Sequence, residues 1–242
     1  RFIGLQNFRT ILTYDRFWIA LGNTVVYVVF SYALMMPMAL LVAWCLANVR
    51  HGRGFYQFVV FLPVVVSVVA ISMLFRMLMD PQTGQLNWLL RSLGLPALSW
   101  LASSDTALLS IVLVDVWKRL GFTLILLTTA IMNVPESLYD AAKVDGAVGW
   151  RLFRHITMPL ITPTFTLVSV METIRGLQVY TSVVVLGPGP GSSTLVINQL
   201  IMDEAFMSWR FGFAAATSLV LFAMVLTLTV VQLRVLRSSW EY

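Results

Sequence analysis

The chain has little charge and almost no cysteine. Of its 242 residues only 11% are charged, whereas soluble domains carry roughly 25%. So few charged side chains cannot cover a water-facing surface, which excludes an ordinary soluble domain. The single cysteine, Cys45, excludes an internal disulfide. The net charge of +5 is not gathered into a basic patch interleaved with aromatic residues, so we expect no nucleic-acid partner.

Hydrophobic residues, in contrast, make up 59% of the chain and gather in long runs. A helix needs about 20 mostly apolar residues to cross the hydrocarbon core of a bilayer. Five runs reach this length, which predicts an all-α fold in which residues 1–242 form one polytopic transmembrane helix bundle. The expected spans are residues 18–47, kinked at Pro37, then 57–79, 107–132, 158–180 and 211–236.

Basic residues are distributed unevenly between the two sets of connecting segments. Cytoplasmic segments of membrane proteins are enriched in Lys and Arg, so we expect the richer set, and with it the C-terminus, in the cytoplasm. The richer set holds Arg50, Arg53, Lys143, Arg151, Arg154, Arg234 and Arg237. The poorer set holds Arg1, Arg9, Arg16, Arg91 and Arg210. An external N-terminus without an initiator methionine leads us to expect a sixth hydrophobic span upstream of Arg1.

The most informative segment is residues 133–163, which the basic residues place on the cytoplasmic side. Pro135 suits the first turn of a helix and Glu136 suits the positive end of its dipole, while Gly146 is a usual stop signal. We therefore expect a short helix between them. An interfacial loop helix and a docking helix for a partner protein fit this pattern equally well.

The same segment resembles the EAA loop of the permeases of binding-protein-dependent ABC importers. In that family Glu-Ala-Ala is followed by three residues, a Gly and, about nine residues later, Ile-x-Leu-Pro. The chain has Asp140-Ala141-Ala142, then Gly146 and residues 156–159, with Asp in place of Glu and Met in place of Leu. The string from Asp145 to Ala147, with Phe153 and residues 156–157 after it, is typical of the carbohydrate-uptake branch. Further similarities to the family run along nearly the whole chain. They lie at residues 2–8, 52–54, 62–63, 117–122, 145–157 and 186–190.

The resemblance implies a permease subunit that forms half of the translocation pathway of an ABC importer in the cytoplasmic membrane of a prokaryote. Its solute would be a sugar, oligosaccharide, polyol or glycerophosphate relative. Its partners would be a second homologous permease, two ATP-binding cassette subunits that use ATP and Mg²⁺, and an external solute-binding protein. The chain lacks the Gly-x-x-x-x-Gly-Lys-[Ser/Thr] phosphate-binding loop, so ATP must be bound elsewhere. By the resemblance, the chain itself would bind no cofactor and would not be an enzyme. The residues implied to dock on the ATPase are Asp140, Ala141, Ala142, Asp145 and Gly146.

Charged and polar residues within the expected spans are candidates for the solute pathway, because a charge at bilayer depth costs at least ~2.5 kcal/mol. The candidates are Arg76, Asp115, Lys118, Ser169, Glu172, Thr173, Arg175 and Gln178. The spacing i,i+4 from Asp115 to Arg119, and i,i+3 from Glu172 to Arg175, equally predicts ion pairs that neutralise one another inside the bundle, and we favour this interpretation.

A stripe of small and hydroxylated residues marks one face of the span at 158–180. Such a stripe serves either close helix packing or a hydroxylated path for a polar solute, and the sequence leaves both open. Its members are Thr162, Thr166, Ser169, Thr173, Gly176 and Tyr180.

Two other functions compete with the permease interpretation. A secondary transporter or channel would have no EAA loop and would purify without an ATPase subunit. A membrane-embedded enzyme would need titratable groups clustered at one depth with a nucleophile or metal ligands. Asp115 and Glu172 are the only acids well inside the expected spans, and His51 and His155 have no partners at metal-ligand spacing. We therefore expect no metal site.

Overall fold

A computed structural model describes residues 4–49 and 51–236, and all regular secondary structure in that part of the chain is helical. The predicted all-α architecture is confirmed. Three of the basic residues used above, Arg1, Arg50 and Arg237, lie outside the described residues.

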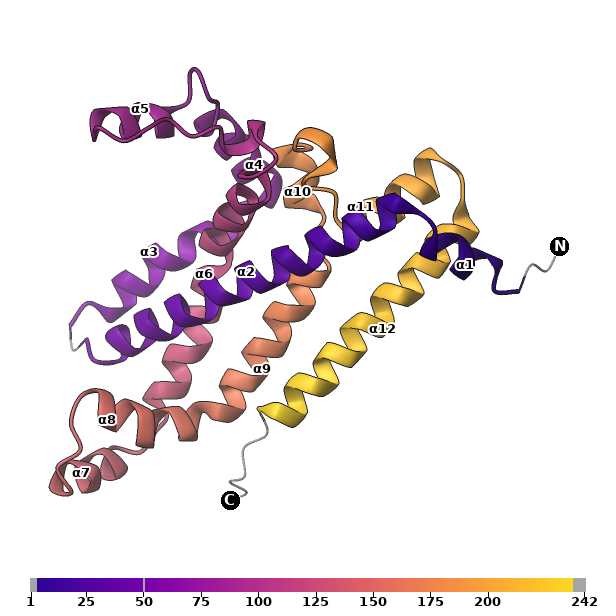
Figure 1. Ribbon diagram of the computed structural model, residues 1–242. Coiled ribbons are helices and arrows are strands. Elements are labelled where there is room, and N and C mark those ends of the chain that lie inside the picture. The colour runs from indigo at the N-terminus through magenta and orange to yellow at the C-terminus, as the bar shows by residue number, and fades with distance from the viewer. Residues whose placement is uncertain (1–3, 50, 237–242) are drawn as a thin grey trace.

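Long helices form the body of the molecule (Figure 1). They are α2 (Asp15–Ala47), α3 (Arg53–Val65), α4 (Val68–Leu78), α6 (Ala107–Met132), α9 (Met158–Leu177) and α12 (Phe211–Val235). Short helices occupy the connections: α1 (Gln6–Leu12), α5 (Gln85–Ser92), α7 (Glu136–Val144), α8 (Trp150–Leu152), α10 (Thr181–Leu186) and α11 (Ile197–Met202). α2 continues through Pro37 as one helix of 33 residues.

The span expected at residues 57–79 is not one helix. The backbone leaves the helical conformation at Val66 and Ser67, and α3 and α4 are bent by 92° about this break. The cause is local, because Pro63 is followed by three consecutive valines, and β-branched residues lose side-chain freedom in a helix.

By length and composition, α2 and α12 could each cross a membrane, and the bent pair of α3 and α4 would make a third crossing. α6 and α9 do not meet this criterion. α6 is long enough but carries Asp115, Lys118 and Arg119 near its middle, and α9 carries Glu172 and Arg175. These two helices differ from α2 and α12, whose charged residues lie at or near the helix ends.

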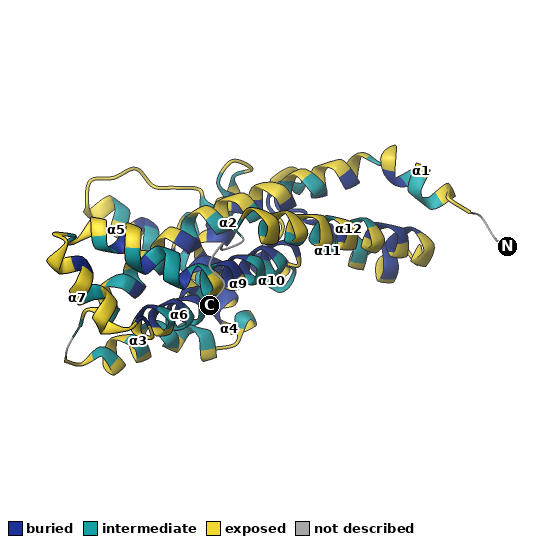
Figure 2. Ribbon diagram, turned by 90° about the horizontal axis from the view of Figure 1, so that it is seen from below, coloured by how far each residue is buried: buried dark blue, intermediate teal, exposed yellow. Residues whose placement is uncertain are grey.

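α6 is the central helix of the bundle and packs against α2, α3 and α9. The residues of α6 are largely buried and those of α9 mostly buried or intermediate, whereas the outer surfaces of α3 and α12 are exposed (Figure 2). Tyr27, Ile111 and Leu124 are fully buried in this main core. A smaller core, around Leu177 and Phe213, joins α1, α11 and α12.

The two ends of the bundle differ in charge and in content. α7, α8 and the C-terminal ends of α2 and α12 lie at one end, and α1, α5, α10 and α11 lie at the other (Figure 1). The first end carries the described members of the richer basic set, including Arg53, Lys143 and Arg234, and the second carries Arg9, Arg16, Arg91 and Arg210. In the structure, the described residues of each set of basic residues therefore lie together at one end of the bundle.

Candidate functional site

The segment predicted to hold a docking helix does contain one, α7. Pro135 precedes its first residue, Glu136, so an acidic side chain stands at the positive end of the helix dipole, while Lys143 stands at the negative end. The apolar residues of α7 are divided between two environments: Ala142 is buried, whereas Leu138 and Val144 are exposed, Val144 to 88%. α7 therefore presents uncovered apolar surface away from the bundle.

Gly146 ends α7 as predicted. Its N–H donates to the carbonyl of Lys143 at 3.0 Å, and the N–H of Ala147 donates to that of Ala142 at 2.8 Å. These two bonds form a Schellman motif, which requires a left-handed residue at the glycine position. Gly146 has φ +79°, and an added Cβ atom would meet nothing within 4 Å. Among the described residues no side chain or backbone atom crowds this position, so glycine is required there for its backbone conformation alone.

The five residues implied to dock do not share one environment. Asp140, Ala141, Asp145 and Gly146 are exposed, while Ala142 is 6% exposed and packs inward. Asp140 accepts an ion-pair contact from Lys143 at 2.9 Å on the exposed face. Four of the five are thus available to a partner, and Ala142 anchors the helix.

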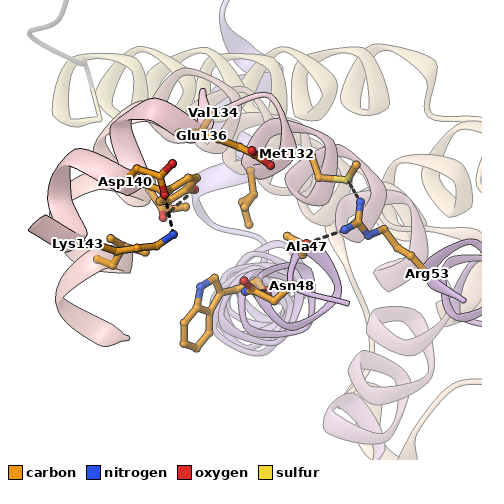
Figure 3. A pocket seen from close by; sticks show the side chains of 13 residues that line it. Ala47, Asn48, Arg53, Met132, Val134, Glu136, Asp140 and Lys143 are labelled. Carbon is orange, nitrogen blue, oxygen red and sulfur yellow. Dashed lines mark hydrogen bonds and ion pairs between the residues drawn. The ribbon is translucent and has the colours of Figure 1, made fainter. Parts of the chain in front are cut away.

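A cavity of about 550 Å³ lies between α7 and the ends of α2 and α6. Figure 3 shows Asp140 and Lys143 on one side of it and Arg53 on the other. Sequence reasoning missed the role of Arg53, whose guanidinium donates to the carbonyls of Leu46, Ala47 and Val49 at 2.8–3.0 Å. A cation at a helix C-terminus satisfies carbonyls that have no partner within the helix.

The segment after α7 is tied to the body of the bundle. α8 continues through a π-helical turn, Phe153–Thr157, directly into α9. Tyr139 of α7 shares a hydrogen bond with Thr157 at 3.1 Å. The Phe153 ring packs on Trp44 of α2 with ring centroids 5.4 Å apart. α7 therefore contacts the helix that leads into α9, and π-helical turns of this kind are frequent at functional sites.

Charged side chains meet where α2, α6 and α9 adjoin. Arg119 of α6 contacts Glu172 of α9 at 2.7 Å and Asp115 at 3.4 Å, while Arg175 contacts Glu172 at 3.1 Å. The two ion pairs predicted from i,i+4 and i,i+3 spacing are both present. Hydroxyl groups complete the network: Tyr27 donates to Asp115, and Thr123 donates to Glu172.

The other pathway candidates lie apart from this network. Lys118 donates to the carbonyl of Val64 at 3.4 Å, beside the break between α3 and α4. Arg76 is exposed and lies near Gly187, where an added Cβ would be 3.6 Å from its guanidinium carbon. Gln178 is exposed and follows the end of α9.

The hydroxylated stripe of α9 is largely buried between helices. Ser169 accepts a hydrogen bond from Tyr32 of α2 at 3.0 Å, and Thr173 accepts one from Gln232 of α12 at 2.7 Å. A Cβ on Gly176 would lie 3.2 Å from the Val28 side chain. Beside Thr173, a largely apolar cavity of about 750 Å³ separates α2 from α12. Among the described residues, no three His, Cys, Asp or Glu side chains converge as metal ligands would.

Comparisons with known proteins identify the family to which the chain is similar. The family "Binding-protein-dependent transport system inner membrane component" matches residues 35–238. The chain is 35% identical to the probable ABC transporter permease YurN of Bacillus subtilis, over 99% of this chain and 84% of that protein. It is 32% identical to the trehalose/maltose permease MalF of Thermococcus litoralis, over 97% and 79%.

Solved structures give the same result. The chain superposes with a TM-score of 0.88 at 27% identity, over 97% of its length and 83% of the other chain, on a bacterial alginate ABC transporter in complex with an alginate pentasaccharide-bound periplasmic protein. The chain therefore belongs to the family of binding-protein-dependent transport system inner membrane components, the permease subunits of ABC importers.

Proposed function

We propose that this chain forms half of the translocation pathway for a sugar or related polar solute and that α7 docks on a separate ATPase subunit. The observation that carries the proposal is α7 itself: a short helix closed by Gly146, exposed at Asp140, Ala141 and Asp145, and linked through Tyr139 to the helix that enters α9. The sugar-type solute is supported by relatives named for trehalose/maltose, lactose and sn-glycerol-3-phosphate.

The proposed topology has five crossings, made by α2, the bent pair α3–α4, α6, α9 and α12. The α7 end lies in the cytoplasm because it gathers the basic residues. The proposed partners are a second homologous permease, two ATP-binding cassette subunits that bind ATP and Mg²⁺, and an external solute-binding protein. A structural relative solved with a periplasmic protein supports the last of these.

Within this subunit we assign Ser169 and Thr173 to helix packing, supported by their burial and by their bonds to Tyr32 and Gln232. Asp115 and Glu172 hold α2, α6 and α9 together. The remaining candidates are at least partly exposed and are proposed as contacts for the solute: Lys118, Arg175, Arg76 and Gln178.

Cysteine labelling tests the packing assignment. Ser169→Cys and Thr173→Cys, each in a Cys45→Ser background, should resist small aqueous thiol reagents. If both react and solute slows the labelling, these two positions line the solute pathway instead.

The coupling role is tested with a pair of glycines. Gly146 and Gly94 both have positive φ, +79° and +73°, and a Cβ added to either meets nothing within 4 Å. Gly146→Asp strains the end of α7 by about 1 kcal/mol or more and alters the docking surface. Gly94→Asp imposes similar strain in the segment after α5, at the opposite end of the bundle. We expect Gly146→Asp to abolish uptake and Gly94→Asp to leave it within twofold.

The measurements are made on the purified complex in lipid: solute uptake, ATP hydrolysis stimulated by the loaded binding protein, and co-purification of the ATPase subunit. Asp140→Lys should act like Gly146→Asp, because it reverses charge on the exposed face of α7. Normal transport with normal stimulated hydrolysis in Gly146→Asp would show that α7 is not the coupling element, and purification without any ATPase subunit would favour a secondary transporter.

A further inference from the structure

The acids near the middle of the bundle face inward and are fully engaged. Glu172 is 5% exposed and Asp115 is 7% exposed. One oxygen of Glu172 contacts Arg119, and the other accepts from Thr123 at 3.0 Å and from Arg175 at 3.1 Å. Asp115 accepts from Tyr27 and contacts Arg119. No acid of this network is left to meet a solute.

The cations near the middle of the bundle, in contrast, are not all paired with acids. Lys118 is partly exposed and has no carboxylate within 4.0 Å in the part of the chain that the structure describes. Its ammonium group donates to the carbonyl of Val64. The Arg175 side chain is 37% exposed and gives one of its five N–H donors to Glu172. Together with Arg119, these residues make three cations, whereas the network has only two acids. One positive charge is therefore not balanced, and it lies on the partly exposed Lys118 and Arg175 side chains.

Lys118 and Arg175 belong to one face, formed with Phe122. Lys118 and Phe122 are four residues apart on α6 and therefore neighbours on one side of that helix. The Arg175 guanidinium lies over the Phe122 ring, 4.6 Å from its centroid. We call Lys118, Phe122 and Arg175 the cationic face. It joins α6 to α9 beside the break between α3 and α4.

A charged face at this depth is costly in contact with lipid, and intramembrane cations usually face water or a polar partner. Building on the proposed function, we infer that the cationic face lines the solute pathway and favours a solute that carries an anionic group, a carboxylate or a phosphate. The ring of Phe122 adds an apolar surface for the body of such a solute. An uncharged sugar would supply no negative charge to balance the cationic face.

A cysteine reporter tests the sign of the local charge without knowledge of the solute. Phe122→Cys, in a Cys45→Ser background in the purified complex, is treated with an anionic and with a cationic methanethiosulfonate, and each rate is divided by that of a free thiol. Clefts of one charge raise the encounter rate of the opposite charge by about 10-fold or more. We expect the anionic reagent to be favoured by about that factor, and the preference to fall when Lys118→Met is added.

Leu113→Cys is the matched control, because Leu113 is an exposed apolar residue of α6 outside the face; it should react with neither reagent. Ile125→Cys, three residues beyond Phe122, is the second reporter if Phe122→Cys does not fold. A reporter that is unreactive, or that reacts equally with both signs, overturns the inference.

The chemical identity of the anionic group is determined by testing which solute protects the cysteine reporter from labelling. Glucuronate, glycerol 3-phosphate and glucose are compared at equal concentration, with sodium chloride added to equal ionic strength. Slower labelling with glucuronate assigns a carboxylate, and slower labelling with glycerol 3-phosphate assigns a phosphate. Equal protection by glucose, or no protection by either anion, overturns the anionic preference. If stimulated ATP hydrolysis persists in that case, the permease function stands and only the inference about charge is lost.

Discussion

Arg119 of α6 donates to Glu172 of α9 at 2.7 Å, although no periodicity within either helix connects the two residues. This contact joins helices that are far apart in the sequence. It also gives the guanidinium two acids, because Asp115 lies 3.4 Å away on the same helix. The network therefore holds together the two charged helices, α6 and α9.

Glu172→Gln should destabilise the bundle strongly. The substitution leaves Arg119 with one acid in a buried setting, and breaking a buried pair typically costs about 3–5 kcal/mol. Unfolding by SDS, followed by circular dichroism, measures the loss. Lys143→Ala is the control, since its partner Asp140 is 70% exposed in its side chain and exposed pairs contribute about 0–1 kcal/mol. Equal losses in the two variants would contradict a structural role for the network.

Gly121→Ala should also weaken the fold. A Cβ on Gly121 would collide with the carbonyl oxygen of Val60 and come within 2.7 Å of the Phe61 Cα atom, so α3 would have to move. Overpacking of this kind costs about 1–3 kcal/mol. Gly22→Ala in α2 meets nothing within 4 Å and should be neutral or stabilising, because alanine favours helix by about 1 kcal/mol. Thermal unfolding of both variants in one detergent distinguishes the two effects.

Asn87→Leu should loosen the arm that carries α5. The Asn87 amide donates to the carbonyls of Pro81 and Leu98, and its oxygen accepts from the Leu98 N–H and the Trp100 indole. Leucine fills similar space but leaves these groups without partners, at about 1–3 kcal/mol each where buried. Limited proteolysis should cut residues 80–106 faster, while Gln85→Leu, at an exposed position of α5, should not change the rate.

The turn after α4 should weaken in acid. The backbone N–H of Thr83, then the Thr83 hydroxyl and the N–H of Gln82, donate to Asp80 and hold the pKa of its carboxyl below the usual value. A lowered pKa in the folded state stabilises the turn above the unfolded pKa of about 3.9. That contribution is lost as pH falls through the folded value. Amide exchange at residues 82–84, corrected for the intrinsic rate, should therefore accelerate on acidification, and Asp80→Asn should remove the change.

Hydropathy and spacing predicted much of this molecule. α6 begins and ends at the residues expected, because its apolar run is bounded by polar segments on both sides. The two ion pairs within single helices followed from spacing alone. Gly146 was identified as the stop signal of a short helix that starts at Pro135 and Glu136, and its positive φ is consistent with that role.

The features that sequence reasoning missed are ones that hydropathy and helical spacing do not report. The break at Val66 and Ser67 has a local cause, but it lies inside a long hydrophobic run, so hydropathy gives no sign of it. Arg53 counted only as a loop charge, although it caps α2. The need for glycine at 121 comes from Val60, a residue of another helix.

The continuity of α8, the π-helical turn and α9 has a mechanical consequence. From Trp150 to Leu177 the backbone stays helical without a break, which makes a rod roughly 40 Å long at about 1.5 Å per residue. Tyr139 and Trp44 contact this rod near one end, and Glu172 sits near the other. A displacement of α7 that tilts this helical segment would move Glu172 sideways relative to Arg119. The hydrogen bond between the two residues would then bend rather than stretch.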